Sequence, residues 1–94
     1  MDVAATIKEI LCDDIFVEVP VAEMDPDDSL RDVYGLDSLG FVELRVQAQN
    51  RFGVQILDAD YSPENFATIR TVSALVERLL AETPAATPAA SGRA

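Results

Sequence analysis

The chain has 94 residues, of which 49% are hydrophobic and 26% are charged, and its formal net charge is −10. This length supports one domain with a single core, and the negative charge argues against nucleic acid and anionic membranes as partners, because both carry like charge. The absence of histidine excludes Ser-His and Cys-His catalysis, and a single cysteine, Cys12, excludes an internal disulfide.

The first predicted element is an amphipathic helix that starts at Val3. Apolar residues follow at the i+4, i+7, i+8 and i+12 positions, which is the spacing of one helical face. These residues are Ile7, Ile10, Leu11 and Ile15. Cys12 is expected to pack beside this face as a small apolar residue. Pro20 stops any continuation of the helix, since it lacks a backbone N–H and restricts the preceding residue to extended geometry.

A long acidic loop is predicted next. Pro26, the cluster of residues 27–29 and Gly35 favour turns, and a loop of this length in a small domain is typically functional. Five apolar residues are expected to anchor the loop to the core: Val21, Met24, Leu30, Val33 and Leu36. Residues 13–43 contain ten acidic residues and one basic residue, Arg31. Such a run is either a solvated surface or a docking surface for basic proteins.

Two partial calcium-loop patterns occur, and neither is complete. The pattern that starts at Asp25 has leucines, Leu30 and Leu36, where the calcium loop requires glycine and glutamate. The pattern that starts at Asp58 fails in the same way, with Pro63 and Ile69 at these positions. The sequence therefore predicts no metal site.

A second helix is predicted from Ser38 to Phe52, with Gly53 as its left-handed C-terminal cap. Two apolar series follow helical spacing. They are Leu39, Val42 and Val46, and Phe41, Leu44, Ala48 and Phe52. Gly40 in the first turn costs up to about 1 kcal/mol relative to alanine. Its presence indicates either packing that leaves no room for a side chain or the close approach of a partner, of which we prefer the second.

The segment after Gly53 is expected to be an extended connector in which Val54 and Ile56 fill the core. A short helix is predicted to follow, from Ser62 to Ile69. Ser62 suits its cap and Pro63 its first position. Its inward anchors are expected to be Phe66 and Ile69.

The last predicted helix starts at Thr71 and ends before Pro84. Its apolar residues recur at helical spacing and are Val72, Leu75, Val76, Leu79 and Leu80. Residues 83–94 contain two prolines and few large apolar groups, so we expect a disordered tail after a domain of residues 1–82. The sequence as a whole predicts an all-α fold, a small four-helix bundle with three longer helices and one short helix.

The start of the chain lacks the basic region and the apolar run of a secretory signal, and no segment is long enough to span a membrane. A single cysteine in a domain of this size is typical of a reducing compartment. We therefore expect a cytoplasmic protein.

The segment Tyr34-Gly35-Leu36-Asp37-Ser38-Leu39-Gly40 places a serine at the mouth of the second helix. A hydroxyl there lies beside unsatisfied N–H groups and the positive end of the helix dipole, an environment that tolerates a phosphate. A plain helix cap worth about 1 kcal/mol is the alternative. The string Asp37-Ser38-Leu39, with Gly35-Leu36 before it and Val42-Glu43-Leu44 after it, resembles the prosthetic-group attachment motif of acyl carrier proteins. The resemblance covers roughly Val3 to Leu80.

This resemblance implies that Ser38 carries covalent 4'-phosphopantetheine, with Asp37 and Leu39 completing the attachment site. A separate, magnesium-using phosphopantetheinyl transferase would attach it through attack of the Ser38 hydroxyl on the β-phosphate of coenzyme A. The thiol of the arm would hold acyl groups as thioesters, and the chain itself would not be an enzyme. The further implied partners are an acyl- or aminoacyl-loading ligase or acyltransferase, a ketosynthase or condensation enzyme, and a thioesterase, all acting on a monomer.

The resemblance also implies docking of partners through the second helix. Here Arg45 and Arg51 balance the two acidic residues of that helix region. Exposed Leu39, Phe41 or both are therefore expected to contribute more to partner recognition. The negative field is expected to come from the preceding loop. The expected partner-binding residues are Gly40, Phe41, Glu43, Asp32 and Asp28.

Gly40 stands where fatty-acid carriers commonly hold an acid, and residues 57–69 resemble discrete carriers of polyketide or mixed peptide-polyketide pathways. We therefore prefer such a pathway to fatty-acid synthesis. A peptidyl or aminoacyl carrier is the nearest alternative, although Asp37 stands where those carriers commonly have histidine. An acidic interaction module without carrier activity is the alternative of another class.

The interior around Val42, Val46, Ile56 and Leu75 is expected to open for an acyl chain.

Overall fold

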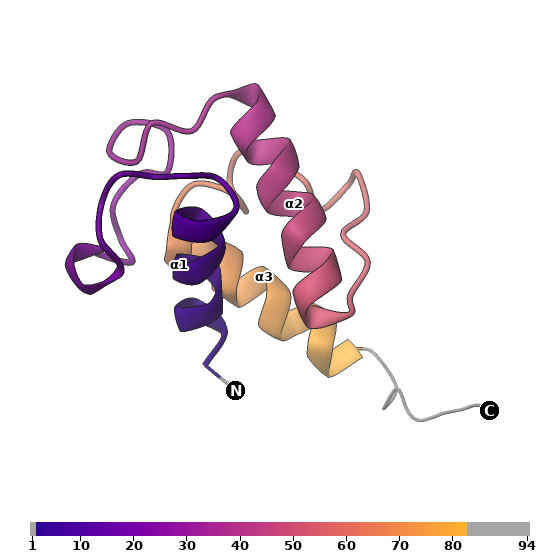
Figure 1. The fold of residues 1–94 in the computed structure, drawn as a ribbon. Helices are drawn as coiled ribbons and strands as arrows, with labels where there is room; N and C mark the ends of the chain where they lie inside the picture. Colours follow the sequence, from indigo (N-terminus) through magenta and orange to yellow (C-terminus); the bar gives the residue numbers. More distant parts are fainter. Residues whose placement is uncertain (1, 83–94) are drawn as a thin grey trace.

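Three α-helices and one 3₁₀ helix are found in residues 2–82, the part of the chain that this computed structural model describes (Figure 1). Their order is α1 (Val3–Asp13), η1 (Val21–Glu23), α2 (Ser38–Phe52) and α3 (Ile69–Glu82). No strand occurs in this range, where Ser29 and Thr68 form an isolated antiparallel bridge. The predicted all-α bundle is confirmed. The tail expected at residues 83–94 lies outside the described residues.

Helix α1 presents its predicted apolar face to the core, against α2 and α3. Its buried residues are Val3, Ile7, Ile10 and Leu11. The carboxylate of Asp2 caps the helix by accepting a hydrogen bond from the Ala5 N–H at 3.1 Å. Ile15 follows the helix end and is half-buried, and so is Cys12, whose Sγ donates to the Val19 carbonyl oxygen at 3.4 Å. Cys12 packs against the core as expected.

Helix α2 has the predicted bounds, and it uses only one of its two apolar series for the core. Leu44, Ala48 and Phe52 are buried, whereas Val42 and Val46 are exposed. The expectation that these two valines belong to the interior is wrong, because a helix on the surface of a small bundle buries one stripe and leaves the other in solvent. Gly53 ends the helix in the left-handed conformation, with φ of 67°.

The connection from α1 to α2 runs away from the helices and returns to the N-terminal end of α2 (Figure 1). Met24, Leu30 and Leu36 anchor it in the core as predicted, but Val21 and Val33 are exposed. Val21 lies in η1, which buries none of its residues, and Val33 lies in a tight turn in which its N–H donates to the Ser29 carbonyl at 2.9 Å. Local hydrogen bonding therefore decides which side chains of the loop reach the core.

Gly35 allows this turn to close. Its φ is 75°, in the left-handed region where residues with a Cβ are unfavourable. The reversal brings the Leu36 N–H within 3.0 Å of the Leu30 carbonyl oxygen. Residue 37 and the start of α2 are thereby fixed relative to the core.

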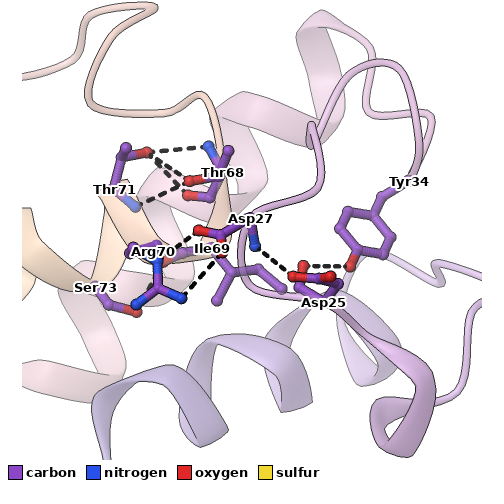
Figure 2. Close-up of polar contacts among 8 residues, drawn as sticks. All are labelled: Asp25, Asp27, Tyr34, Thr68, Ile69, Arg70, Thr71 and Ser73. Carbon is purple, nitrogen blue, oxygen red and sulfur yellow. Dashed lines mark hydrogen bonds and ion pairs between the residues drawn. The ribbon is translucent and has the colours of Figure 1, made fainter.

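The same loop is fastened to the beginning of α3 (Figure 2). The guanidinium of Arg70 donates to both carboxylate oxygens of Asp27, at 2.5 and 3.1 Å, and the Arg70 N–H donates to the Pro26 carbonyl at 2.9 Å. The hydroxyl of Tyr34 donates to the Asp25 carbonyl at 2.9 Å, and burial raises the pKa of Tyr34. Backbone and side-chain contacts thus join two segments that are 43 residues apart in sequence.

The short helix predicted from Ser62 is not formed. Residues 63–66 make turns, in which Ser62 Oγ accepts from the Asn65 N–H at 3.2 Å and the Ser62 carbonyl accepts from the Phe66 N–H at 3.0 Å. The Ala67 carbonyl accepts instead from the Leu30 N–H at 2.9 Å, so pairing with the long loop replaces a second helical turn. Phe66 is nevertheless buried, as predicted.

Helix α3 begins at Ile69, two residues earlier than predicted, because Thr68 and Thr71 form a reciprocal cap (Figure 2). The Thr71 N–H donates to Thr68 Oγ1 at 3.1 Å, and the Thr68 N–H donates to Thr71 Oγ1 at 3.0 Å. The helix buries Ile69, Val72, Ser73, Leu75 and Val76, which include three of its five predicted inward residues, while Leu79 and Leu80 are half-buried. The predicted connector is also confirmed, since Val54 and Ile56 are buried.

Candidate functional site

Ser38 is the first residue of α2, and it does not cap the helix. The cap is Asp37, which has extended backbone geometry and accepts the Gly40 N–H on its Oδ1 at 2.9 Å. The Asp37 carbonyl accepts the Phe41 N–H at 3.0 Å. The side chain of Ser38 is exposed and has no hydrogen-bond partner among residues 2–82. Its hydroxyl is therefore free for chemistry.

Gly40 is explained by packing within the chain. A Cβ at this position would lie 3.2 Å from Leu36 Cγ and 3.5 Å from Asp37 Oδ1. Leu36 is buried with 5% of its surface exposed, so it has little room to move away. The first of the two interpretations of Gly40, packing that leaves no room for a side chain, thus has a direct structural basis.

An open groove of about 700 Å³ lies beside Ser38, and we refer to it as the Ser38 groove. Its walls come from α2, from the loop at residues 27–32 and from residues 61–68. Phe41 and Val42 line it on α2, and Tyr61 and Phe66 line it opposite, with their rings packed edge to face at a centroid distance of 5.0 Å. Its volume and aromatic walls are typical of small-molecule sites.

Arg31 also lines the Ser38 groove, and its guanidinium lies 5.9 Å from the centroid of the Phe41 ring. It is the single basic residue of the acidic region, and it lies on the same groove as Ser38. Reasoning from the sequence missed its position, together with those of Tyr61 and Ser62. The bridge between Ser29 and Thr68 and the hydrogen bond from Leu30 N–H to the Ala67 carbonyl bring these segments together, and no local pattern encodes them.

Arg45 holds residues 56–61, which lead into the far wall of the groove. Its Nε and Nη2 donate to the Ile56 carbonyl oxygen at 3.1 and 2.5 Å, and Nη2 also contacts Asp58 Oδ1 at 3.0 Å. The guanidinium lies over the Tyr61 ring, 4.8 Å from its centroid. A second arginine, Arg78, binds Asp60 at 2.9 Å. Side-chain contacts thus position a wall that lacks regular secondary structure.

A second open groove, of about 810 Å³, lies on the other flank of the N-terminal part of α2, and we call it the Phe16 groove. It is formed by residues 14–19, 33–37 and the α2 residues Leu39, Gly40, Val42 and Glu43. Two grooves with different linings therefore flank the same turn of helix.

The predicted site residues divide between these grooves. Ser38, Asp32 and Phe41 line the Ser38 groove, while Asp37, Leu39, Gly40 and Glu43 line the Phe16 groove. Asp28 is half-buried and lines neither. Leu39 is exposed as expected, whereas Phe41 is half-buried against the core. Within residues 2–82, no group of three or more potential ligand side chains could hold a metal ion.

Comparison with known proteins identifies the class of site. Residues 5–79 match the family described as "Phosphopantetheine attachment site". The chain is 42% identical over 60 residues to an acyl carrier protein of Solidesulfovibrio magneticus, which covers 64% of this chain and 74% of that protein. It is 35% identical over 91 residues to the meromycolate extension acyl carrier protein of Mycolicibacterium smegmatis, covering 92% of this chain and 90% of that protein. A D-alanyl carrier protein of Streptococcus gordonii is 36% identical over 72 residues, covering 77% and 87%.

The residues around Ser38 fit such a prosthetic group. Ser38 offers an exposed hydroxyl without a competing hydrogen bond, at a helix N-terminus where N–H groups and the dipole favour a phosphate. The adjacent carboxylate of Asp37 is engaged by the Gly40 N–H, and Arg31 supplies a positive charge on the same groove. The chain belongs to the acyl carrier protein family, whose prosthetic group is covalently attached 4'-phosphopantetheine.

Proposed function

We propose that Ser38 is the attachment site and that the chain carries acyl groups as thioesters on its 4'-phosphopantetheine arm, delivering them to partner enzymes. The supporting observation is the division of roles at the start of α2: Asp37 caps the helix, which leaves the hydroxyl of Ser38 exposed and uncommitted. The chain contains no histidine to serve as a base for that hydroxyl, so we assign activation to the transferase and no catalysis to the carrier. Residues 1–82 are proposed as the carrier domain.

The groups around Ser38 have separate tasks in this proposal. The helix N-terminus and Arg31 stabilise the phosphate, and the aromatic walls of the Ser38 groove offer a surface to the arm or to a short acyl group. In this proposal the acyl group rests in this groove, beside the exposed Val42 that lines it.

Intact-mass measurement tests the attachment site. Incubation of the apo protein with coenzyme A, magnesium and a promiscuous phosphopantetheinyl transferase should add one pantetheinyl phosphate to the wild type and none to Ser38→Ala. Ser62→Ala is the matched control, because Ser62 lines the same groove and should leave the adduct unchanged. An unmodified wild type would leave an acidic interaction module as the explanation.

The proposed pathway is polyketide or mixed peptide-polyketide biosynthesis. The proposed partners besides the transferase are a loading ligase or acyltransferase, a ketosynthase or condensation enzyme, and a thioesterase. The support is the neutral balance of residues 37–52 and the presence of Gly40 in the first turn of α2. Steering by the acidic loop would then provide fast encounter with basic partners.

Extension of long acyl chains is a second candidate, which the names of the meromycolate extension carriers favour, since one of them matches along 92% of this chain. Mass spectrometry of the protein from its producing cells separates the candidates through the mass of the tethered group. A polyketide or aminoacyl intermediate supports the first candidate, and a long saturated or unsaturated acyl chain supports the second.

A further inference from the structure

Phe16, which follows α1 by three residues, combines two unfavourable features. Its side chain is 78% exposed, and its φ is 64°, in the left-handed region that bulky residues disfavour. No other residue except glycine has a positive φ among residues 2–82. Its neighbours Ile15 and Val17 pack against the core, and the Val17 N–H donates to the Leu11 carbonyl at 2.8 Å. The turn is thus held from both sides while the aromatic ring is left in solvent.

Exposed apolar side chains from three segments meet at the Phe16 groove. Phe16 comes from the turn after α1, Val33 from the long loop, and Leu39 and Val42 from α2. Between 49% and 79% of each side chain is exposed. A contiguous apolar patch of this kind on a small domain marks an interaction surface.

The lining of the Phe16 groove also includes four acidic residues. Asp14, Glu18, Asp37 and Glu43 line it together with the apolar residues, and no basic residue of the described chain does so. Asp14 is paired with Arg51 at 3.0 Å, while the other three have no ion pair within residues 2–82. A groove lined by both apolar and acidic side chains is complementary to an apolar side chain flanked by lysine or arginine. A second copy of the chain, with its own charge of −10, has the wrong sign.

We propose that the Phe16 groove is a docking site for a basic amphipathic segment of a partner protein, which inserts an apolar side chain between Phe16 and Leu39. This goes beyond the proposed function, because it assigns recognition to the turn after α1, on the flank of α2 opposite the Ser38 groove. It is independent of whether Ser38 is modified.

A peptide titration followed by nuclear magnetic resonance tests this proposal on the full chain. The probe is a synthetic 14-residue amphipathic peptide with a leucine face and a lysine face. The reference peptide has the same lysines and alanine in place of each leucine. The titration uses Ser38→Ala protein, so that attachment of the prosthetic group has no part in the result. The leucine peptide should shift backbone amides of residues 14–19 and 33–43, and the alanine peptide should bind at least tenfold more weakly.

Two variants separate docking from nonspecific attraction. Phe16→Asn should weaken binding of the leucine peptide at least fivefold, whereas Leu57→Asn should leave it unchanged, because Leu57 is exposed but lines neither groove. Phe16→Asn should also keep or raise the melting temperature, since asparagine tolerates the left-handed region and loses no buried contact.

Four outcomes of the peptide and variant experiments would overturn the proposal, and a fifth concerns the protein without peptide. They are equal binding of the two peptides, shifts centred on residues 61–68, equal weakening by Leu57→Asn, and a lower melting temperature for Phe16→Asn, which would make Phe16 a folding residue. Shifts at residues 14–19 that depend on protein concentration without peptide would indicate a second copy as the occupant, and would also overturn it.

Discussion

The Gly40 backbone N–H donates to Asp37 Oδ1 at 2.9 Å, so the helix cap and the free hydroxyl belong to adjacent residues and not to the same one. Replacement of Asp37 by alanine should therefore lower the free energy of unfolding by about 1 kcal/mol. Ser38→Ala should change it by less than about 0.5 kcal/mol, because an exposed side chain without a partner contributes little. Urea unfolding of both variants measures the difference. An equal loss in Ser38→Ala would show that the serine shares the capping role.

Gly40 is the second position at which the start of α2 can be tested. In an open helix, Gly→Ala stabilises by up to about 1 kcal/mol. Here the new methyl group would lie 3.2 Å from Leu36 Cγ, so displacement of Leu36 should offset that gain. We expect Gly40→Ala to be neutral or destabilising in urea unfolding, with amide shifts at residues 34–37. A gain of the full amount would mean that the contact with Leu36 relaxes freely.

Arg45 should be more important for stability than its ion pair suggests. Its guanidinium satisfies the Ile56 carbonyl with two donors and has 22% of its side chain exposed, whereas Asp58 is 98% exposed. Arg45→Lys should cost about 1–3 kcal/mol, because an ammonium cannot reproduce the planar fork. Asp58→Ala, the matched control, should cost less than about 0.5 kcal/mol. Urea unfolding measures both, and a comparable loss in the two variants would locate the stabilisation in the ion pair instead.

The Asp27–Arg70 pair should make stability depend on acid pH. The hydrogen bond from Arg70 lowers the pKa of Asp27 below its usual value near 4. A lowered folded-state pKa contributes stability that is present above the unfolded pKa and is lost as the pH falls through the folded pKa. The difference in melting temperature between wild type and Asp27→Asn should therefore be largest above about pH 5 and should close as the pH falls through the lowered folded-state pKa.

Asp32→Asn is the control for this pH dependence, because Asp32 is exposed and has no ion pair among the described residues. The difference in melting temperature between the wild type and Asp32→Asn should not close in this way as the pH falls. Both residues of the Asp27–Arg70 pair are 65% exposed, so the effect should shrink as salt is added.

Strong local signals allowed the sequence to predict α1, α2 and the connector. The bounds of α2 follow from a capping aspartate before Ser38 and a glycine at position 53, and both act within one turn of the helix. The buried positions of α1 and α3 follow from periodicity. The position of Ser38 at the mouth of a helix could be predicted for the same reason.

The sequence-based predictions are wrong for residues whose local structure or burial depends on contacts with distant segments. Ser62 begins a turn as its cap chemistry predicts, but the chain then pairs with Leu30 instead of continuing as a helix. Val42 follows helical spacing as well as Leu44 does, and only the placement of α1 and α3 decides which of them is buried. The two grooves could not be predicted for this reason, since each joins segments that no local pattern relates.

Helix α2 separates the two grooves, and Val42 is the single described residue that lines both. Neighbouring residues around position 38 consequently line different grooves: Ser38 and Phe41 line one, and Leu39 and Gly40 line the other. Under the two proposals above, substitutions at neighbouring positions of α2 would change separately what the carrier holds and which partner it binds. A substitution of Val42 would change both grooves at once, because its side chain lines both.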